Sequence, residues 1–178
     1  GVKLREYQAI GVAFMRANQY HAILGDEPGL GKTLQVLAAL ALAPDKLPAL
    51  IIAPTSVVGV WAREAGIFTP GLKVRTARAK GKLRVGEAIQ SALRAQWDLL
   101  VIGWDSLRIA ADELIAAAEA GRWRSLVMDE AHTAKNRGSA RGQTIEKIAR
   151  LAPGGVIAVT GTLVENNPDE AWAVLDMV

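Results

Sequence analysis

Residues 26–33 have the sequence Asp-Glu-Pro-Gly-Leu-Gly-Lys-Thr and lie between a short apolar run and a helical pattern. Gly29 and Gly31 allow a tight turn in which successive backbone N–H groups point toward phosphate oxygens. The helix that follows adds the positive end of its dipole at the same place. Lys32 can then reach the β- and γ-phosphates of a nucleotide, and Thr33 can offer its hydroxyl to Mg²⁺. The stretch predicts a phosphate-binding loop between a strand and a helix.

Two residues of this loop depart from the general pattern. Asp26 stands where the Walker pattern has glycine, and Pro28 lacks an N–H group at a position that need not donate one. The match is therefore partial, although Gly-Lys-Thr occurs in the required strand–loop–helix setting. We expect ATP and Mg²⁺ to be bound by Asp26, Glu27, Pro28, Gly29, Leu30, Gly31, Lys32 and Thr33.

Outside the loop, short apolar runs alternate with segments of helical period. Continuous runs of valine, isoleucine and leucine are typical of strands buried on both faces of a parallel sheet. We expect strands at residues 22–24, 50–53, 99–102, 126–128 and 156–159. We expect helices near residues 4–18, 32–43, 57–67, 86–96, 105–119, 139–151 and 168–178, the last capped by Asn167. The alternation predicts an α/β fold with a mostly parallel central sheet and helices on both faces.

A second informative stretch runs from Leu126 to His132, where an apolar strand ends in Asp129 and Glu130. Acids at the carboxyl end of a strand lie where α/β folds bind their ligands. Asp129 is placed to hold Mg²⁺, directly or through water, and Glu130 to position and polarise an attacking water. Together with Lys32, these two acids form the expected catalytic set.

The composition indicates one globular domain. The chain has 178 residues, of which 51% are hydrophobic and 22% charged, and this balance excludes a disordered chain. It has no cysteine, which excludes disulfide scaffolds and cysteine nucleophiles, and its two histidines lack the spacing of zinc ligands. Because no apolar run reaches the roughly 18 residues of a membrane span and no signal peptide precedes the fold, we expect an intracellular protein without a membrane partner.

The net charge of +3 hides a basic stretch between residues 73 and 84. No acid occurs between Glu64 and Glu87, whereas this stretch contains Lys73, Arg75, Arg78, Lys80, Lys82 and Arg84. A local cluster of positive charge on a mildly acidic chain is typical of a protein that binds a polyanion. A solvated loop explains the same composition equally well, so both interpretations stay open.

Six stretches occur in the order of a known set of motifs: residues 4–8 with Gly11, 24–35, 50–57 with Trp61 and Glu64, 98–107, 126–136, and 159–162 with Glu165, Asn166 and Trp172. In this order they resemble the N-terminal, RecA-like lobe of the Swi/Snf-type DNA-dependent ATPases, within the helicase superfamily that includes DEAD- and DEAH-box proteins. The chain differs from the usual family pattern at Pro28, at His132, which gives a DEAH ending, and at Leu163, which replaces a proline.

The resemblance implies roles for further residues. Gln8 would recognise adenine, and His132, Thr160, Gly161 and Thr162 would couple the nucleotide to the rest of the enzyme. A cap on the strand end is an alternative role for the two threonines. The residues implied to contact the phosphates of double-stranded DNA are Thr55, Ser56, Trp104 and Arg108.

The resemblance also implies a second lobe, which brings arginine fingers to the γ-phosphate. Because this sequence stops just after the sixth stretch, we expect residues 1–178 to be one lobe without its C-terminal partner lobe. Such a lobe would be monomeric, would bind Mg·ATP and DNA weakly, and would hydrolyse ATP poorly. It would act in the cytoplasm or nucleoid of a prokaryote or phage, or in a eukaryotic nucleus.

Two other classes of protein are compatible with the phosphate-binding loop. One is a ring-forming AAA-type ATPase, in which Pro-Gly at residues 28–29 would be familiar; the other is a non-catalytic nucleotide-binding module. Gln8 and the Thr-Gly-Thr of residues 160–162 favour the helicase-like ATPase. The five tryptophans are most simply core residues, with Trp104 the one expected near the DNA-binding face.

Overall fold

The computed structural model describes residues 3–77, 82–134, 139–161 and 174–178, with the backbone alone at 82–84. Its centre is a sheet of six strands in the order β1-β6-β5-β2-β4-β3, with every neighbouring pair parallel. The strands are β1 Ala22–Leu24, β2 Ala49–Ala53, β3 Val74–Ala77, β4 Leu99–Gly103, β5 Ser125–Asp129 and β6 Gly155–Val159. The predicted α/β fold with a parallel sheet is confirmed.

The strand that the apolar runs did not predict is β3, at one edge of the sheet. It pairs only with β4, and its sequence Val-Arg-Thr-Ala alternates apolar with polar residues inside the basic stretch. An edge strand needs fewer apolar side chains than a central one, because one side has no neighbouring strand. The described part of the basic stretch therefore lies mostly in a strand and a helix and not in a loop: Lys73 precedes β3, Arg75 lies in it, and Lys82 and Arg84 lie in α4. The choice between a polyanion-binding and a solvated surface is the same as before.

The helices are α1 Glu6–Ala17, α2 Lys32–Ala41, α3 Val58–Phe68, α4 Lys82–Arg94, α5 Ser106–Ile109, α6 Ala111–Glu119 and α7 Ala140–Arg150, with short 3₁₀ turns η1 Pro44–Lys46 and η2 Ala131–Ala134. The single helix predicted at 105–119 is wrong in one respect. It is split into α5 and α6 because Ala110, with φ −132° and ψ 43°, leaves the helical conformation. Most of the helix predicted at 168–178, with its cap at Asn167, lies outside the described residues. None of the described helices has the length and apolar character needed to cross a bilayer.

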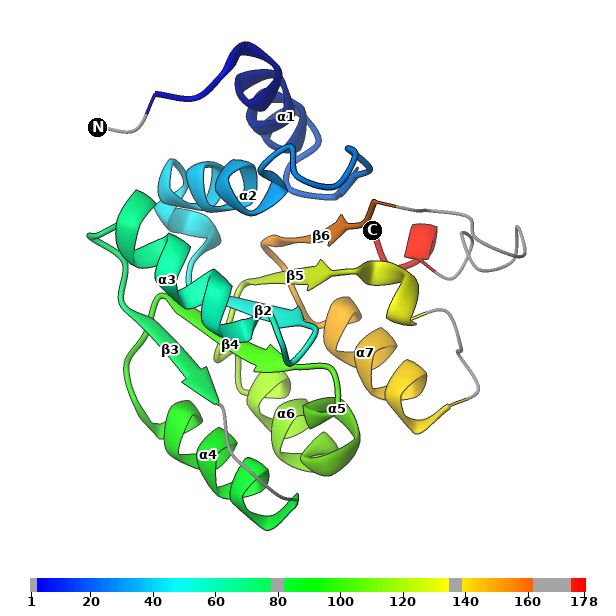
Figure 1. Ribbon diagram of the computed structural model, residues 1–178. Helices are drawn as coiled ribbons and strands as arrows, with labels where there is room; N and C mark the ends of the chain where they lie inside the picture. The colour runs from blue at the N-terminus through cyan, green and yellow to red at the C-terminus, as the bar shows by residue number, and fades with distance from the viewer. Residues whose placement is uncertain (1–2, 78–81, 135–138, 162–173) are drawn as a thin grey trace.

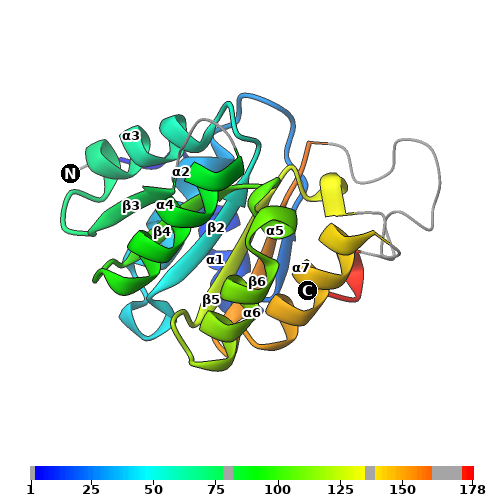
Figure 2. The same cartoon turned by 90° about the horizontal axis from the view of Figure 1, so that it is seen from below.

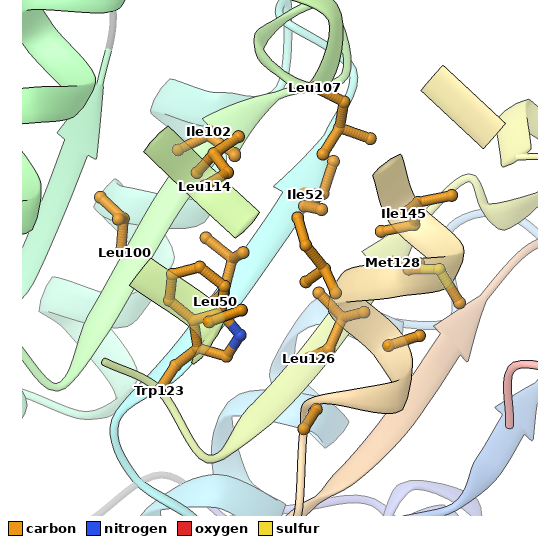
Figure 3. Close-up of a cluster of buried hydrophobic side chains, with 14 of the residues drawn as sticks. Leu50, Ile52, Leu100, Ile102, Leu107, Leu114, Trp123, Leu126, Met128 and Ile145 are labelled. Atoms are coloured by element: carbon orange, nitrogen blue, oxygen red, sulfur yellow. The ribbon is translucent and has the colours of Figure 1, made fainter. Parts of the chain in front are cut away.

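Two hydrophobic cores hold the helices against the sheet. One core joins α1, α2 and α3 to one face, and the other joins α4, α5, α6 and α7 to the opposite face. In Figure 2, α4–α7 lie in front of the sheet and α1 lies behind it. Figure 3 shows the second core, where Trp123 packs beside Leu50 and Leu126. Full burial of each such side chain contributes about 1.5–3 kcal/mol to folding.

The tryptophans confirm the prediction of core residues. Trp61, Trp97, Trp104 and Trp123 are all buried. Trp172 lies outside the described residues.

All six strands end at the same edge of the sheet, which faces the loop before α2 in Figure 1. Leu24 is level with Val159, and Val159 is level with Asp129, so β1, β6 and β5 end side by side. Ala53 and Gly103 are likewise level at the ends of β2 and β4. We call this the carboxyl edge. It brings together the loops that follow these five strands, whose last residues lie up to 135 positions apart in the sequence, from Leu24 to Val159.

Candidate active site

The loop of residues 25–31 joins β1 to α2 with two glycines in left-handed conformations. Gly29 has φ +85°, and Gly31, with φ +72°, immediately precedes the first residue of α2. These conformations favour glycine because other side chains would be strained there. The Lys32 ammonium donates hydrogen bonds to the carbonyls of Asp26 (2.6 Å) and Glu27 (3.0 Å), and the half-buried Thr33 follows in the first helical turn. The predicted loop thus surrounds its lysine at the N-terminus of a helix.

A hydrogen bond to the side chain of Asp26 explains how the loop tolerates this acid at a position where the Walker pattern has glycine. Its Oδ2 accepts a hydrogen bond of 2.9 Å from Nε2 of Gln35, which is fully buried in α2. Oε1 of Gln35 lies against Gly11 of α1, so that a Cβ at Gly11 would collide with it. Gln35 was not predicted as a site residue; the available signal was a polar residue on the apolar face of a helix.

Gln8 lies beside the same loop, and its recognition of adenine stays a prediction. Its Nε2 donates to the carbonyl of Leu30 (3.3 Å), and its Oε1 accepts from the backbone N–H of Arg5 (3.0 Å). A Cβ at Gly31 would come within 2.7 Å of Nε2 of Gln8. Gly31 is therefore required both by its φ angle and by the close approach of Gln8.

Asp129, at the end of β5, is held by two different side chains. Its Oδ2 accepts a hydrogen bond of 2.7 Å from Nε1 of Trp61, and its carbonyl accepts one of 2.9 Å from Nε1 of Trp104. Burial raises the pKa of Asp129, the Trp61 hydrogen bond lowers it, and the Glu130 charge raises it further. The charge of Lys32 also lowers this pKa.

The next residue, Glu130, has φ +51°, in the left-handed region that is uncommon for residues other than glycine. Its backbone N–H donates to Oδ1 of Asp129 (3.1 Å). Backbone strain of this kind costs about 1–3 kcal/mol and is concentrated at functional sites.

Glu64 is a further acid close to this site. Burial raises its pKa, the Arg63 charge lowers it, and the Asp129 charge raises it. Glu64 lies three residues after Trp61 in α3, so both are on the side of the helix that faces Asp129. The sequence placed both residues in a motif but did not predict the hydrogen bond from Trp61 to Asp129 or the effect of the Asp129 charge on Glu64.

His132 connects the acids to β6. Its Nδ1 lies 3.3 Å from Oε2 of Glu130 and 3.5 Å from Oγ1 of Thr160. The backbone N–H of the buried Thr160 donates to the carbonyl of Leu24, at the end of β1. The structure thus brings His132 and Thr160 together beside the phosphate-binding loop, while Thr162 lies outside the described residues.

Gly161 lies directly against that loop. A Cβ at this position would come within 3.2 Å of Cγ of Pro28. The proline that distinguishes this chain from the usual family pattern is therefore in contact with the Thr-Gly-Thr segment.

Of the residues predicted to contact DNA, Thr55 and Ser56 lie in the loop after β2, and Trp104 and Arg108 lie in the segment after β4, Arg108 within α5. Thr55, Ser56 and Arg108 are exposed. Oγ1 of Thr55 lies so close to Gly103 that a Cβ there would come within 2.6 Å, so the two loops pack together. Trp104 is only 4% exposed. The expectation that Trp104 contacts DNA is therefore wrong for its ring, because the indole is buried in the core and donates to Asp129.

The basic stretch is described only in part. Lys73 and Arg75 are exposed at the edge of the sheet, in and before β3. Lys82 and Arg84 belong to the first turn of α4, and Arg78 and Lys80 lie outside the described residues.

The donor set fits a nucleotide with Mg²⁺. Lys32 bonds to backbone carbonyls, and no acid lies within ion-pair distance of it in the described part of the chain. Over the same residues, no group of three or more histidine, aspartate and glutamate side chains could hold a metal by itself. Mg²⁺ at phosphates is typically held by one or two protein oxygens plus the phosphates and water, which matches one hydroxyl and one carboxylate here.

Comparison with known proteins gives a consistent result. The model of the SNF2-related domain matches residues 7–178. The chain is 32% identical, over 99% of its length, to the "ISWI chromatin-remodeling complex ATPase ISW2" of Saccharomyces cerevisiae, of which it covers 16%. It is 36% identical, over 98% of its length, to an ATP-dependent helicase of Mycoplasma pneumoniae, of which it covers 17%.

Among solved structures, the SWI2/SNF2 ATPase core of Sulfolobus solfataricus in complex with double-stranded DNA matches with a TM-score of 0.77 and 26% identity. The match covers 99% of this chain and 36% of that one. The chain thus spans a small part of the length of the relatives it matches.

Proposed function

Because the chain belongs to the SNF2-related domain family and has its RecA-like fold, we propose that it is the N-terminal, ATP-binding lobe of an ATPase that moves along double-stranded DNA. One observation carries the proposal: Lys32, which follows β1 at the start of α2, the Asp129–Glu130 pair at the end of β5 and Thr160 directly after β6 meet at the carboxyl edge of the sheet. The family match also favours this function over an AAA-type ring ATPase.

In this function the phosphate-binding loop holds the nucleotide. Lys32 and the backbone N–H groups of residues 29–33 bind the β- and γ-phosphates. Thr33 and Asp129 would hold Mg²⁺, and the ion would supply positive charge to the phosphates. Gln8 lies beside the loop on α1, where it can recognise adenine.

Glu130 orients the attacking water and accepts its proton. The nearby His132 and Thr160 link this acid to β6, and the contact between Pro28 and Gly161 links β6 to the phosphate-binding loop. A change at the γ-phosphate would therefore reach the segment that follows β6 through two separate contacts.

DNA would bind across the loops that follow β2 and β4. Thr55, Ser56 and Arg108 are exposed there and offer hydroxyl and guanidinium donors, which suit phosphate oxygens. The matching ATPase core of Sulfolobus solfataricus was solved in complex with double-stranded DNA, which supports a duplex as the ligand. The basic stretch of residues 73–84 would add charge to the same contact.

The 178 residues contain the motifs of one lobe, and we propose that hydrolysis needs arginine fingers from a second. Such a residue raises turnover by about 10³–10⁵. By itself the chain would be an intracellular monomer that binds Mg·ATP but hydrolyses it slowly.

The first test is the binding and turnover of Mg·ATP by this chain, with and without duplex DNA, beside Lys32→Ala. We expect measurable ATP binding that Lys32→Ala abolishes, and little turnover in either protein. DNA-stimulated turnover by the chain alone would contradict the need for a second lobe. Absence of ATP binding would refute the proposed site altogether.

DNA binding is tested by its salt dependence. If the six basic residues of the stretch 73–84 all contact phosphates, the affinity should fall about 10³-fold between about 50 and 200 mM salt. If the affinity for DNA does not change with salt concentration, the stretch does not contact the DNA phosphates.

A further inference from the structure

Two buried tryptophans reach Asp129 from opposite faces of the sheet. Trp61 belongs to the core under α1–α3 and is 1% exposed, whereas Trp104 belongs to the core under α4–α7. One indole donates to the carboxylate and the other to the carbonyl of the same residue. We call Trp61 and Trp104 the tryptophan pair. An indole N–H can only donate, so each contact has a fixed direction.

Each member of the pair is attached to one of the two loops proposed to contact DNA. Trp61 lies one turn into α3, which begins two residues after Ser56. Trp104 directly follows β4 and precedes α5, which carries Arg108. Its backbone N–H also donates to the carbonyl of Ala53, at the end of β2 (3.1 Å).

The two loops also contact each other, so they form one connected unit. Thr55 packs on Gly103, next to Trp104. Asp105, the residue after Trp104, forms an ion pair of 2.8 Å with the guanidinium of Arg141 in α7. A shift of either loop would therefore move at least one of the two indoles that hold Asp129.

The orientation of a metal ligand depends on the groups that hydrogen-bond to it. Loss of such a supporting bond typically lowers metal affinity or activity 10–100-fold. The hydrogen bond from Trp61 takes one carboxylate oxygen, and the N–H of Glu130 bonds the other. The carboxylate thus has a defined orientation before any metal is bound.

We propose that the tryptophan pair positions Asp129 for Mg²⁺ and connects this acid to the two DNA-facing loops. The pair would transmit a displacement of either loop directly to the Mg²⁺ ligand, and Trp61 would have the larger effect because it contacts the carboxylate itself. This inference rests on the proposed ATP-binding function, and the experiment separates the two.

The test compares the dissociation constant of ATP in Mg²⁺ and in EDTA for the wild-type chain and three variants. Trp61→Phe and Trp104→Phe each remove one N–H but keep an aromatic ring. Trp97→Phe is the matched control, because the indole of this buried tryptophan donates to the carbonyl of Ala92, in α4. In Mg²⁺, we expect the affinity of Trp61→Phe for ATP to be about 10-fold lower than that of the wild-type chain. The affinity of Trp104→Phe should fall less. Affinity in EDTA should not change in any variant.

The outcomes are distinct. If Lys32→Ala abolishes ATP binding but Trp61→Phe keeps the full effect of Mg²⁺, the role of the pair is refuted and the ATP site stands. If the wild-type chain binds no ATP, both proposals fail. An equal loss in Mg²⁺ and in EDTA, or the same loss in Trp97→Phe, would indicate a structural effect only and would also refute the positioning role.

A second measurement uses only the wild-type chain and therefore does not depend on whether a variant folds. Each tryptophan gives one indole N–H signal in a ¹⁵N-correlated spectrum of the wild-type chain. Addition of Mg·ATP, and separately of duplex DNA, should shift the signals of Trp61 and Trp104 more than those of Trp97 and Trp123. If the signals of the pair do not move on either addition, the proposed connection is wrong.

Discussion

The carboxyl edge of the sheet and the interior beneath it follow opposite rules. At the edge, polar side chains are tied by single directed hydrogen bonds, as in Gln35 to Asp26 and Trp61 to Asp129. The backbone there adopts unusual conformations at Gly29, Gly31 and Glu130. In the interior, apolar side chains are fully buried and the central strands pair in continuous parallel register. The difference indicates that the edge serves function and the interior supplies stability, so substitutions should separate the two properties.

The largest effect should come from the interior. Leu126→Ala removes a fully buried side chain of β5 and leaves a cavity. We expect the free energy of unfolding in urea to fall by about 2–5 kcal/mol, while the ATP affinity of the folded protein stays unchanged. Ile10→Ala, at a position 64% exposed in α1, is the matched control and should change stability by less than about 0.5 kcal/mol. A large loss of ATP affinity in folded Leu126→Ala would contradict the separation.

The next prediction tests whether the backbone conformation of Glu130 is strained. Glu130→Ala and Glu130→Gly both remove the carboxylate, but only glycine adopts φ +51° without strain. We expect Glu130→Gly to be more stable than Glu130→Ala by about 1 kcal/mol, measured by thermal unfolding. Both variants should lack ATP hydrolysis when the second lobe is supplied. Equal stabilities would show that this backbone conformation is not strained.

A smaller effect is expected at Gln35, which supports the phosphate-binding loop from α2. Gln35→Leu places an apolar side chain of similar size at this buried position and removes the hydrogen bond to Asp26, so ATP affinity should fall about five- to tenfold. The control is Gln90→Leu, which removes an exposed hydrogen bond from glutamine to Glu113, away from the edge. This control should leave ATP binding unchanged. Equal effects of the two substitutions would mean that Gln35 does not position the loop.

The sequence predicted the parts of this molecule that depend on local chemistry. The loop of residues 26–33 carries its glycines, lysine and threonine in one stretch, and the acids follow directly after an apolar strand. The central strands could be predicted as well, because burial on both faces of the sheet requires continuous apolar runs in the sequence. Five of six strands were predicted for this reason.

The parts that were missed depend on partners far apart in the sequence. Trp61 and Asp129 are 68 residues apart, and no pattern around either residue indicates the hydrogen bond between them. The burial of Trp104 also follows from packing against β5 and not from its neighbours in the chain. Strand β3 was missed because an edge position tolerates the alternating charged sequence that argued for a loop.

The smallest expected effect concerns two ion pairs that look alike. Arg141 bonds Asp105 across the edge at 2.8 Å, and Arg150 bonds Glu146 within α7 at 2.6 Å. Exposed pairs contribute about 0–1 kcal/mol to stability, so Arg141→Ala and Arg150→Ala should differ little in urea unfolding. They should differ in DNA binding, because Asp105 directly precedes α5, which carries Arg108, whereas Arg150 lies at the far end of its helix. We expect Arg141→Ala to weaken duplex binding about two- to threefold, because α5 would be held less firmly, and Arg150→Ala to leave duplex binding unchanged. If both variants bind duplex DNA equally well, the ion pair between Arg141 and Asp105 has no more influence on DNA binding than the pair within α7.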